Sequence, residues 1–300
     1  MNRIKLSPTL EVSNIVHGHW RLLDWNLTNQ DLLKLTKQSI DLGITTFDHA
    51  DIYGNYSCEK VFGDALNLDK GLRNDIQIIT KCGIKLVSDK FPSRKLKSYD
   101  YSFNHIVSSV ENSLKNFRTD YIDVLLLHRP SPFFNPEEVA KAFSHLKKQG
   151  KVQNFGVSNF NPQQFEMLNS HVEEELVTNQ VEISPYCLEH FDNGNIDYFL
   201  TKKIKPMAWS PLGGGNILSP TNSKGQRLLN TLKEVANELS INDIDSLIYS
   251  WLLNHPSSII PIVGSGKIHR LKNSVDALTL KIPSDLWQKI YVASLGEELP

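Results

Sequence analysis

Short β-rich runs alternate with longer segments of helical periodicity along almost the whole chain. Eight runs have the length and the β-branched or aromatic content that is typical of strands. The run 122–127 is almost wholly apolar, as expected for a parallel strand that is covered on both faces. The predicted strands are 14–19, 45–49, 76–81, 122–128, 153–158, 177–182, 206–210 and 259–264.

The segments between these runs have the spacing of amphipathic helices. In 29–42, the side chains of Leu32, Leu35 and Leu42 fall on one helical face, and Gly43 follows where a helix should end. The same periodicity predicts helices at 104–117, 136–149 and 226–239, and two further ones at 243–254 and 284–294.

Eight alternations of strand and helix favour a closed (β/α)8 barrel or a doubly wound sheet. No Gly-x-Gly-x-x-Gly motif follows the first strand, which disfavours the doubly wound alternative. Residues 3–12 fit a hairpin that closes the barrel floor. We therefore predict a single (β/α)8 TIM-barrel domain over residues 1–300, with two extra helices and an N-terminal β-hairpin.

Composition narrows the class of protein. The 32 basic and 33 acidic residues leave a net charge of −1, so no broad basic field is available for nucleic acid or an anionic membrane. The three cysteines have no metal-binding spacing, and no apolar run approaches the length of roughly 20 residues that spans a bilayer. The first residues lack the apolar core of a signal peptide. We expect a soluble cytoplasmic protein.

Four polar residues stand where chemistry is placed in such barrels, at the C-terminal ends of strands. Asp48 and Tyr53 follow the second predicted strand, Lys81 ends the third and His128 ends the fourth. A free tyrosine has a pKa of about 10, and a nearby ammonium group is expected to lower it. Asp48 can fix that ammonium group, and His128 can donate a hydrogen bond to a substrate oxygen. This set predicts general acid catalysis with electrostatic support.

The stretches that carry these residues resemble the signatures of the aldo-keto reductase family. They are 43–54 (GITTFDHADIYG), 79–83 (ITKCG), 120–128 (DYIDVLLLH) and 151–160 (KVQNFGVSNF). The resemblance runs from about residue 3 to residue 292. The segment 207–215 (MAWSPLGGG) makes the resemblance strongest to one bacterial branch of the family, which consists of uncharacterised oxidoreductases.

The resemblance implies an NAD(P)H-dependent enzyme that reduces an aldehyde or ketone to an alcohol, with Tyr53 as the proton donor and Asp48, Lys81 and His128 in support. It also implies binding of NADP(H). The residues it assigns to cofactor binding are Gly18, Trp20, Ser158, Asn159, Gln180, Trp209, Ser210, Leu212, Gly264, Ser265, Gly266, Lys267 and Arg270.

Within that set the resemblance implies different tasks. Ser158, Asn159 and Gln180 would bond the nicotinamide carboxamide, and Trp209 would stack on the ring, where most members have Tyr or Phe. The segment 264–267 would meet a phosphate at a helix N-terminus. Arg270 would pair with the adenosine 2′-phosphate. Many members have a Lys directly after the Ile-Pro of the last strand, whereas this chain has Ile262 there, and Lys267 is a candidate replacement.

Structural alternatives exist for the cofactor residues. Ser158 and Asn159 would also suit the N-cap of a helix that opens near residue 162. Trp209 would also suit simple core packing, and Lys267 and Arg270 would also suit a solvated surface.

Two other functions compete with the reductase. A cofactor-binding regulatory or sensor subunit, without significant turnover, would keep the same cofactor residues. The second alternative is a metal-dependent hydrolase, because the metal site of amidohydrolase barrels includes a His-x-His pair on the first strand, as His17 and His19 are here. However, the ends of the later strands lack the further ligands that this site needs. We therefore predict no metal, and we expect Trp20 and His19 to line the substrate pocket.

Overall fold

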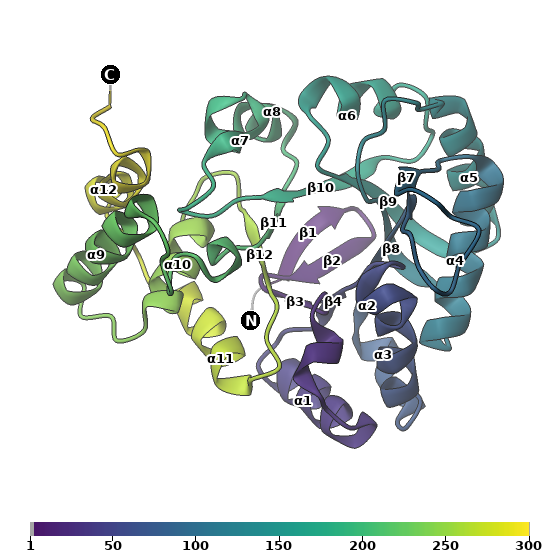
Figure 1. Cartoon of the computed structure of the whole chain (residues 1–300), viewed down its shortest axis with the longest axis horizontal. Helices are drawn as coiled ribbons and strands as arrows, with labels where there is room; N and C mark the ends of the chain where they lie inside the picture. The colour runs from purple at the N-terminus through teal and green to yellow at the C-terminus, as the bar shows by residue number, and fades with distance from the viewer. Residues whose placement is uncertain (1–2, 300) are drawn as a thin grey trace. The chain divides into compact units, whose positions relative to one another are not determined.

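Eight parallel strands form a closed barrel in the computed structural model, which describes residues 3–299 (Figure 1). Their order around the barrel is β10-β11-β12-β3-β4-β5-β8-β9. Each overlaps one of the eight predicted strands, so the predicted (β/α)8 barrel is confirmed. The strands are β3 (Val16–Gly18), β4 (Thr46–Asp48), β5 (Gln77–Cys82), β8 (Ile122–Leu127), β9 (Val152–Ser158), β10 (Leu176–Glu182), β11 (Met207–Trp209) and β12 (Ile260–Val263).

The chain divides into two compact units. The first comprises Met1–Asn179 and Gly264–Gly266, and the second comprises Gln180–Val263 and Lys267–Pro300. The prediction of one domain over residues 1–300 stays a prediction.

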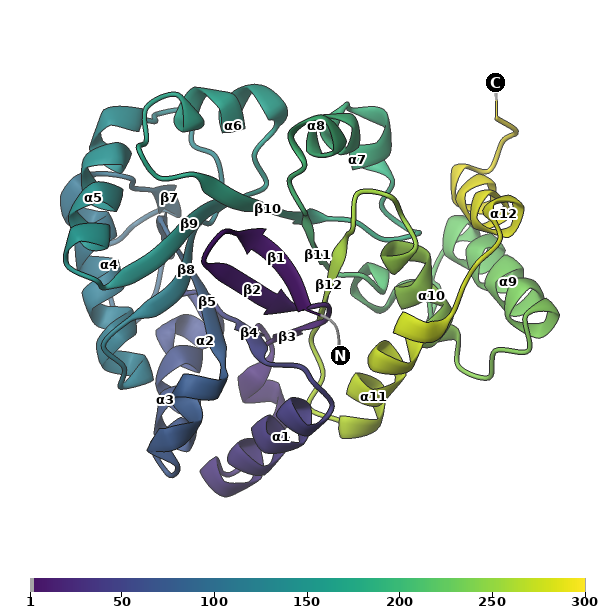
Figure 2. The same cartoon turned by 180° about the vertical axis from the view of Figure 1, so that it is seen from behind.

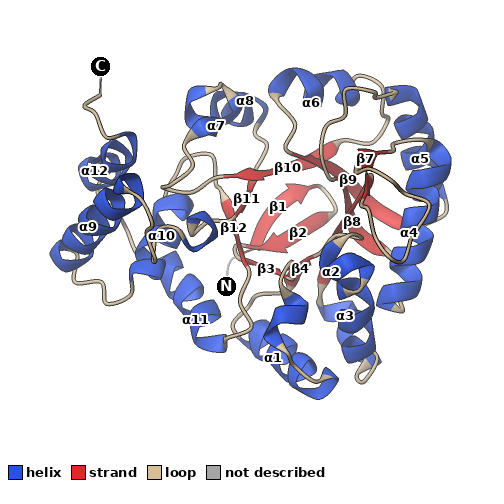
Figure 3. Ribbon diagram, viewed as in Figure 1, coloured by secondary structure: helices blue, strands red, loops and turns tan. Residues whose placement is uncertain are grey.

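Helices follow the strands of the first unit in turn (Figure 3). Polar residues fix where they begin, because an N-cap side chain accepts a hydrogen bond from an amide of the first turn. Thr28, Ser102, Asn135 and Asn161 do this for four helices. The longer helices are α1 (Asn29–Asp41), α3 (Cys58–Leu66), α4 (Phe103–Phe117), α5 (Pro136–Lys148) and α6 (Pro162–Asn169).

The strand β8 lies at the centre of the first unit's packing. It pairs in parallel with β5 on one side and β9 on the other. All of its residues are buried except Asp123, which is partly buried. The prediction of an apolar strand covered on both faces is thus confirmed, and β5 and β8 carry Lys81 and His128 at or directly after their C-terminal ends.

The N-terminal hairpin consists of β1 (Arg3–Ser7) and β2 (Leu10–Ser13), which pair antiparallel (Figure 2). Arg3 donates hydrogen bonds to Thr45 Oγ1 at 2.8 Å and to Gln77 Oε1 at 2.6 Å. These residues stand at the starts of β4 and β5, so the hairpin lies at the end of these strands that is opposite to Asp48 and Lys81. The predicted hairpin over 3–12 is confirmed.

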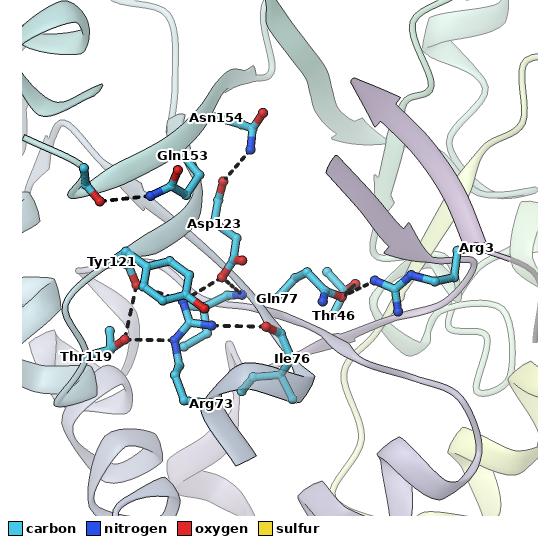
Figure 4. A network of polar contacts seen from close by, with 12 residues as sticks. Arg3, Thr46, Arg73, Ile76, Gln77, Thr119, Tyr121, Asp123, Gln153 and Asn154 are labelled. Carbon is cyan, nitrogen blue, oxygen red and sulfur yellow. Dashed lines mark hydrogen bonds and ion pairs between the residues drawn. The ribbon is translucent and has the colours of Figure 1, made fainter. Parts of the chain in front are cut away.

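A mostly buried ion pair joins the 3-10 helix η2 (Lys70–Asp75) to the barrel strands (Figure 4). Arg73 Nη2 lies 2.8 Å from Asp123 Oδ2, and Arg73 Nε donates to Thr119 Oγ1 at 2.9 Å. The guanidinium group also lies 3.8 Å from the centre of the Tyr121 ring. Asp123 accepts a second bond from the Ile78 amide at 2.8 Å, so one carboxylate connects η2, β5 and β8.

The second unit has its own apolar cluster among its helices. Trp251 and Trp287 stack at 4.4 Å between ring centres, and each donates its indole N–H to the other's backbone carbonyl. The two extra helices that the sequence predicts are α10 and α12. The helices are α7 (Glu189–Asp192), α8 (Asn195–Lys202), α9 (Ser223–Glu238), α10 (Ile244–Leu253), α11 (Ile268–Asp276) and α12 (Ser284–Leu295).

Among residues 3–299, none of the helices is both long enough and apolar enough to cross a membrane. The elements not predicted from the apolar pattern include the turn-like α2 (Tyr53–Tyr56) and the two-residue strands β6 (Ile84–Lys85) and β7 (Ser98–Tyr99), which pair antiparallel.

Candidate active site

Lys81 is the centre of the polar cluster. Its side chain is 1% exposed, and its ammonium group donates to both carboxylate oxygens of Asp48 at 2.8 Å. It also donates to the backbone carbonyl of His49 at 2.7 Å. A buried charge requires such compensation, because an unpaired ion in the interior is strongly destabilising. Asp48 therefore fixes Lys81, as predicted.

Tyr53 presents its hydroxyl to this pair. Lys81 Nζ lies 3.2 Å from Tyr53 Oη, and the Tyr53 ring lies edge-on to the His128 ring at 5.9 Å between centres. The chain reaches this point by continuing beside β5, because the amides of His49 and Asp51 donate to the carbonyls of Ile79 and Lys81. The four predicted side chains thus meet at the C-terminal ends of β4, β5 and β8.

Opposed effects set the pKa of Tyr53. Burial raises it above its ordinary value of 10.0, the positive charge of Lys81 lowers it, and the carboxylate of Asp48 raises it further. Lys81 thus lowers this pKa, as expected, but the net shift is upward, so the expectation of a pKa below the free value is wrong. The loss of water around the phenolate exceeds the attraction of the ammonium group.

Lys81 itself stays charged. Burial alone would lower the pKa of Lys81, but the charge of Asp48 and the contact with Tyr53 raise it above its ordinary value of 10.5. At neutral pH, the site therefore holds a protonated phenol beside an ammonium–carboxylate pair.

His128 is a neutral imidazole. Burial, together with the positive charge of Lys81, lowers its pKa well below 6.5. Its amide donates to the Cys82 carbonyl at 3.0 Å, which holds the residue against the end of β5. Its Nδ1 is buried and has no hydrogen-bond partner in the described part of the chain. A neutral ring carries one N–H that can be donated to an acceptor.

Ser158 and Asn159 lie directly beside His128. The Asn159 amide donates to Ser158 Oγ at 2.8 Å and to the carbonyl of His128 at 3.2 Å. Asn159 has a φ of 63°, in the left-handed region. The N-cap of α6 is Asn161, which forms a capping box with Gln164. The alternative that Ser158 and Asn159 cap this helix is therefore wrong.

Comparison with known proteins identifies the family of this chain. The model of the Aldo/keto reductase family matches residues 14–293. The chain belongs to this family. The uncharacterised oxidoreductase YcsN of Bacillus subtilis (strain 168) is 49% identical to this chain over 300 residues. The match covers 100% of both chains. The predicted likeness to bacterial uncharacterised oxidoreductases is confirmed.

Two further similarities are informative. A protein of Agrobacterium fabrum named 6-dehydroglucose reductase is 40% identical over 300 residues, which are 100% of both chains. The solved glycerol dehydrogenase from Gluconobacter oxydans superposes with a TM-score of 0.84 at 19% identity, over 99% of this chain and 97% of that one. At that identity, the solved structure supports the fold alone.

The first barrel strand of this aldo/keto reductase only partly matches its predicted role. Gly18 is buried and pairs with Asp48 across the sheet, and Trp20 is 58% exposed. His19 is completely buried and packs against Trp25 and the edge of Phe62. The expectation that His19 lines the substrate pocket is therefore wrong, because aromatic side chains enclose its ring.

Three imidazoles lie close together in this aromatic cluster. The ring centres of His17 and His19 lie 4.5 Å apart, as do those of His19 and His49. His17 Nε2 lies 3.0 Å from the Ser265 carbonyl, and its Nδ1 lies 3.3 Å from Ser39 Oγ. Burial lowers the pKa of His17 to about 4. No three His, Cys, Asp or Glu side chains of the described residues are grouped so that they could hold a metal ion, and the His17–His19 pair belongs to the core.

The loop after β12 lies in the first unit. Gly264 is exposed, Ser265 is buried and Gly266 is partly buried. A Cβ on Gly266 would come within 2.7 Å of the Trp25 ring, so a larger residue is excluded there by this close approach. The predicted phosphate contact of these three residues stays a prediction.

The remaining predicted cofactor residues lie in the second unit. Gln180 is buried and pairs with Met207 across the sheet, and Trp209 pairs with Glu182. Ser210 has a φ of 50°. Lys267 is the N-cap residue of α11, and Arg270 and Lys267 are both exposed. The assigned roles of Gln180, Trp209, Ser210, Leu212, Lys267 and Arg270 stay predictions.

Sequence reasoning missed the part that His49 plays. Its carbonyl is a direct partner of Lys81, and its ring is fully buried between His19 and Phe117. Every residue has a backbone carbonyl, so the residue type does not show which carbonyl accepts a hydrogen bond from Lys81. The one signal in the sequence was the position of His49 directly after Asp48. A polar residue at that position suggests a place at the open mouth of the barrel, whereas the His49 ring lies in the core.

Proposed function

We propose that this aldo/keto reductase reduces an aldehyde or ketone to an alcohol, using NADPH as the hydride source and Tyr53 as the proton donor. The observation that carries the proposal is the 3.2 Å contact between Tyr53 Oη and the buried ammonium group of Lys81. A buried phenol beside a fixed cation is suited to proton transfer to a developing alkoxide.

The raised pKa of Tyr53 fits this role. Because burial raises the pKa, the phenol keeps its proton at neutral pH until a stronger base arrives. Once the proton leaves, the phenolate lies beside Lys81, whose charge stabilises it. Asp48 keeps that charge in place through two hydrogen bonds and offsets the cost of burying it. The same groups act in reverse when an alcohol is oxidised.

His128 orients the carbonyl in this proposal. Its pKa is lowered well below 6.5, so the ring is neutral and can donate one hydrogen bond to the substrate oxygen without carrying a charge. The edge-on placement of the His128 ring at 5.9 Å from the Tyr53 ring lets one oxygen atom approach both side chains.

The cofactor would supply the hydride. Ser158 and Asn159 fit a carboxamide, because a serine hydroxyl and a side-chain amide offer the paired donors and acceptors that an amide needs. The first amides of a helix generally lack a full set of partners within the helix, so the start of α11 suits a phosphate group. Arg270 on this helix suits the 2′-phosphate that distinguishes NADPH from NADH.

The substrate class can be narrowed through relatives. The protein of Agrobacterium fabrum that is 40% identical over the whole chain is named for reduction of 6-dehydroglucose. We therefore propose a polyhydroxylated aldehyde of this type as the first substrate to test.

Steady-state oxidation of NADPH with a panel of aldehydes, ketones and sugar aldehydes tests the proposal. We expect turnover with at least one class and weaker use of NADH. Tight NADPH binding without turnover across the panel would contradict the reductase and favour the regulatory or sensor alternative.

A further inference from the structure

The chain takes an unusual conformation directly after Tyr53. Gly54, Asn55 and Tyr56 have φ values of 56°, 52° and 61°, so three successive residues are left-handed. Glycine adopts this region freely, but residues with a Cβ do so only when their surroundings hold them there. Such conformations concentrate at functional sites. The question is which groups hold Asn55 and Tyr56.

Tyr56 is held through its hydroxyl. Tyr56 Oη accepts one hydrogen bond from the Leu86 amide at 2.9 Å and another from Arg94 Nη1 at 2.7 Å. The Arg94 guanidinium lies 3.7 Å from the centre of the Phe91 ring, and that ring meets the Tyr56 ring edge-on at 4.9 Å. Three residues of the segment 86–94 thus converge on one side chain.

The same segment holds the neighbouring residues. Asn55 Nδ2 donates to Asp89 Oδ1 at 2.7 Å, and Asn55 Oδ1 accepts from Ser88 Oγ at 2.6 Å. The Lys90 ammonium group donates to the Tyr56 carbonyl at 3.3 Å and to Ser57 Oγ at 2.5 Å. Both left-handed residues that carry a side chain are therefore fixed by contacts to residues 88–94.

The held turn is connected directly to the proton donor. The Ser57 amide donates to the Tyr53 carbonyl at 3.1 Å, and the Tyr56 amide donates to the Ile52 carbonyl at 3.3 Å. The Tyr53–Lys81 contact of 3.2 Å is at the long end of the hydrogen-bond range, so a small movement of Tyr53 would break it.

We propose that Tyr56 is a positioning residue, and that the segment 86–94, acting through the Tyr56 hydroxyl, holds the backbone that aims Tyr53 at the substrate. This inference rests on the proposed function. It assigns to Tyr56 and Arg94 a part in the proton-transfer step, although neither touches the reacting atoms.

Replacing Tyr56 with Phe tests this role, because Tyr56→Phe keeps the ring and removes the acceptor of two hydrogen bonds. We expect a fall in kcat of about tenfold to a hundredfold, since small misplacements of a catalytic group have effects of this size. The value of kcat/KM should fall by the same factor, as for an interaction used only in the transition state. The solvent deuterium isotope effect on kcat should rise, because proton transfer becomes slower relative to other steps.

Two sets of variants serve as controls. Tyr99→Phe makes the same chemical change at an exposed residue of β7 and should keep the wild-type kcat. Arg94→Met should reproduce the Tyr56→Phe defect, whereas Arg94→Lys should recover part of the activity, because its ammonium group can still donate to the hydroxyl. The NADPH dissociation constant, measured by fluorescence, should stay unchanged in each variant.

A kcat of Tyr56→Phe within twofold of the wild type would overturn the positioning role. So would a loss of NADPH affinity that matches the loss of kcat, since that result indicates general structural damage. Absence of turnover in the wild-type protein would instead overturn the proposed function, and this inference with it.

Discussion

At the scale of single residues, two opposed electrostatic effects act on Tyr53, the proposed proton donor. Burial raises the pKa of Tyr53, and Lys81 at 3.2 Å opposes that rise. The sequence indicates which residues meet, but it does not indicate which effect is larger, because desolvation depends on the complete surroundings of the hydroxyl. The outcome is a phenol that keeps its proton at neutral pH. In the proposed mechanism, the Lys81 cation acts once that proton has left.

The buried imidazoles lead to a prediction about acid stability. The pKa of His17 is about 4 in the folded chain and about 6.5 when unfolded. Between these values the unfolded chain binds the proton and the folded chain does not, so stability falls as the pH drops from about 6.5 to about 4. His17 alone should contribute about 3 kcal/mol to this loss. Urea unfolding at several pH values measures it.

A matched variant identifies the residue responsible. His17→Gln removes the titrating group and keeps polar atoms for Ser39 and Ser265. The free energy of unfolding of this variant should depend less steeply on pH below 6.5 than that of the wild type. Equal slopes for the two proteins would show that His17 does not titrate as its burial implies.

At the scale of elements, local signals made the helices predictable. Thr28 caps α1 and Asn135 caps α5, each at the start of an apolar helical pattern. By contrast, the turn 54–56 depends on contacts such as that between Tyr56 and Arg94, which are 38 residues apart. No local pattern encodes such a contact, and this explains why the left-handed turn and its support were not predicted.

Arg73 provides a test of how η2 is joined to the barrel strands (Figure 4). Arg73→Met would leave the mostly buried carboxylate of Asp123 without its cation, so we expect a loss of about 3–5 kcal/mol in the free energy of unfolding. Arg118→Met is the matched control, because Arg118 pairs with Asp64 at a far more exposed position. The control should lose about 1 kcal/mol or less. Equal losses in the two variants would contradict a special role for the buried pair.

At the scale of the whole molecule, the alternation of strands and helices, together with the lack of a Gly-x-Gly-x-x-Gly motif after the first strand, predicted the closed barrel of eight strands. The meeting of Asp48, Tyr53, Lys81 and His128 was also predictable, because a barrel of this kind gathers the C-terminal ends of its strands. The burial of His19 was not predictable from the sequence. Its ring is surrounded by Trp25, Phe47 and Phe62, and no sequence pattern indicates how these side chains pack.

The predicted single domain has a consequence for unfolding. If residues 1–300 form one cooperative domain, unfolding in urea should follow one transition, with the same midpoint by far-ultraviolet circular dichroism and by tryptophan fluorescence. Trp25 reports on the first unit, and Trp251 and Trp287 report on the second. Two separated transitions would show that the two units unfold independently.

The most direct test of the whole account is the turnover of Tyr53→Phe, measured together with its affinity for NADPH. The variant loses only the hydroxyl that lies 3.2 Å from Lys81 Nζ. We predict that kcat falls by roughly a hundredfold or more, as is typical when a general acid is removed, while the NADPH dissociation constant stays within about twofold of the wild type. Turnover close to that of the wild type would show that another group donates the proton.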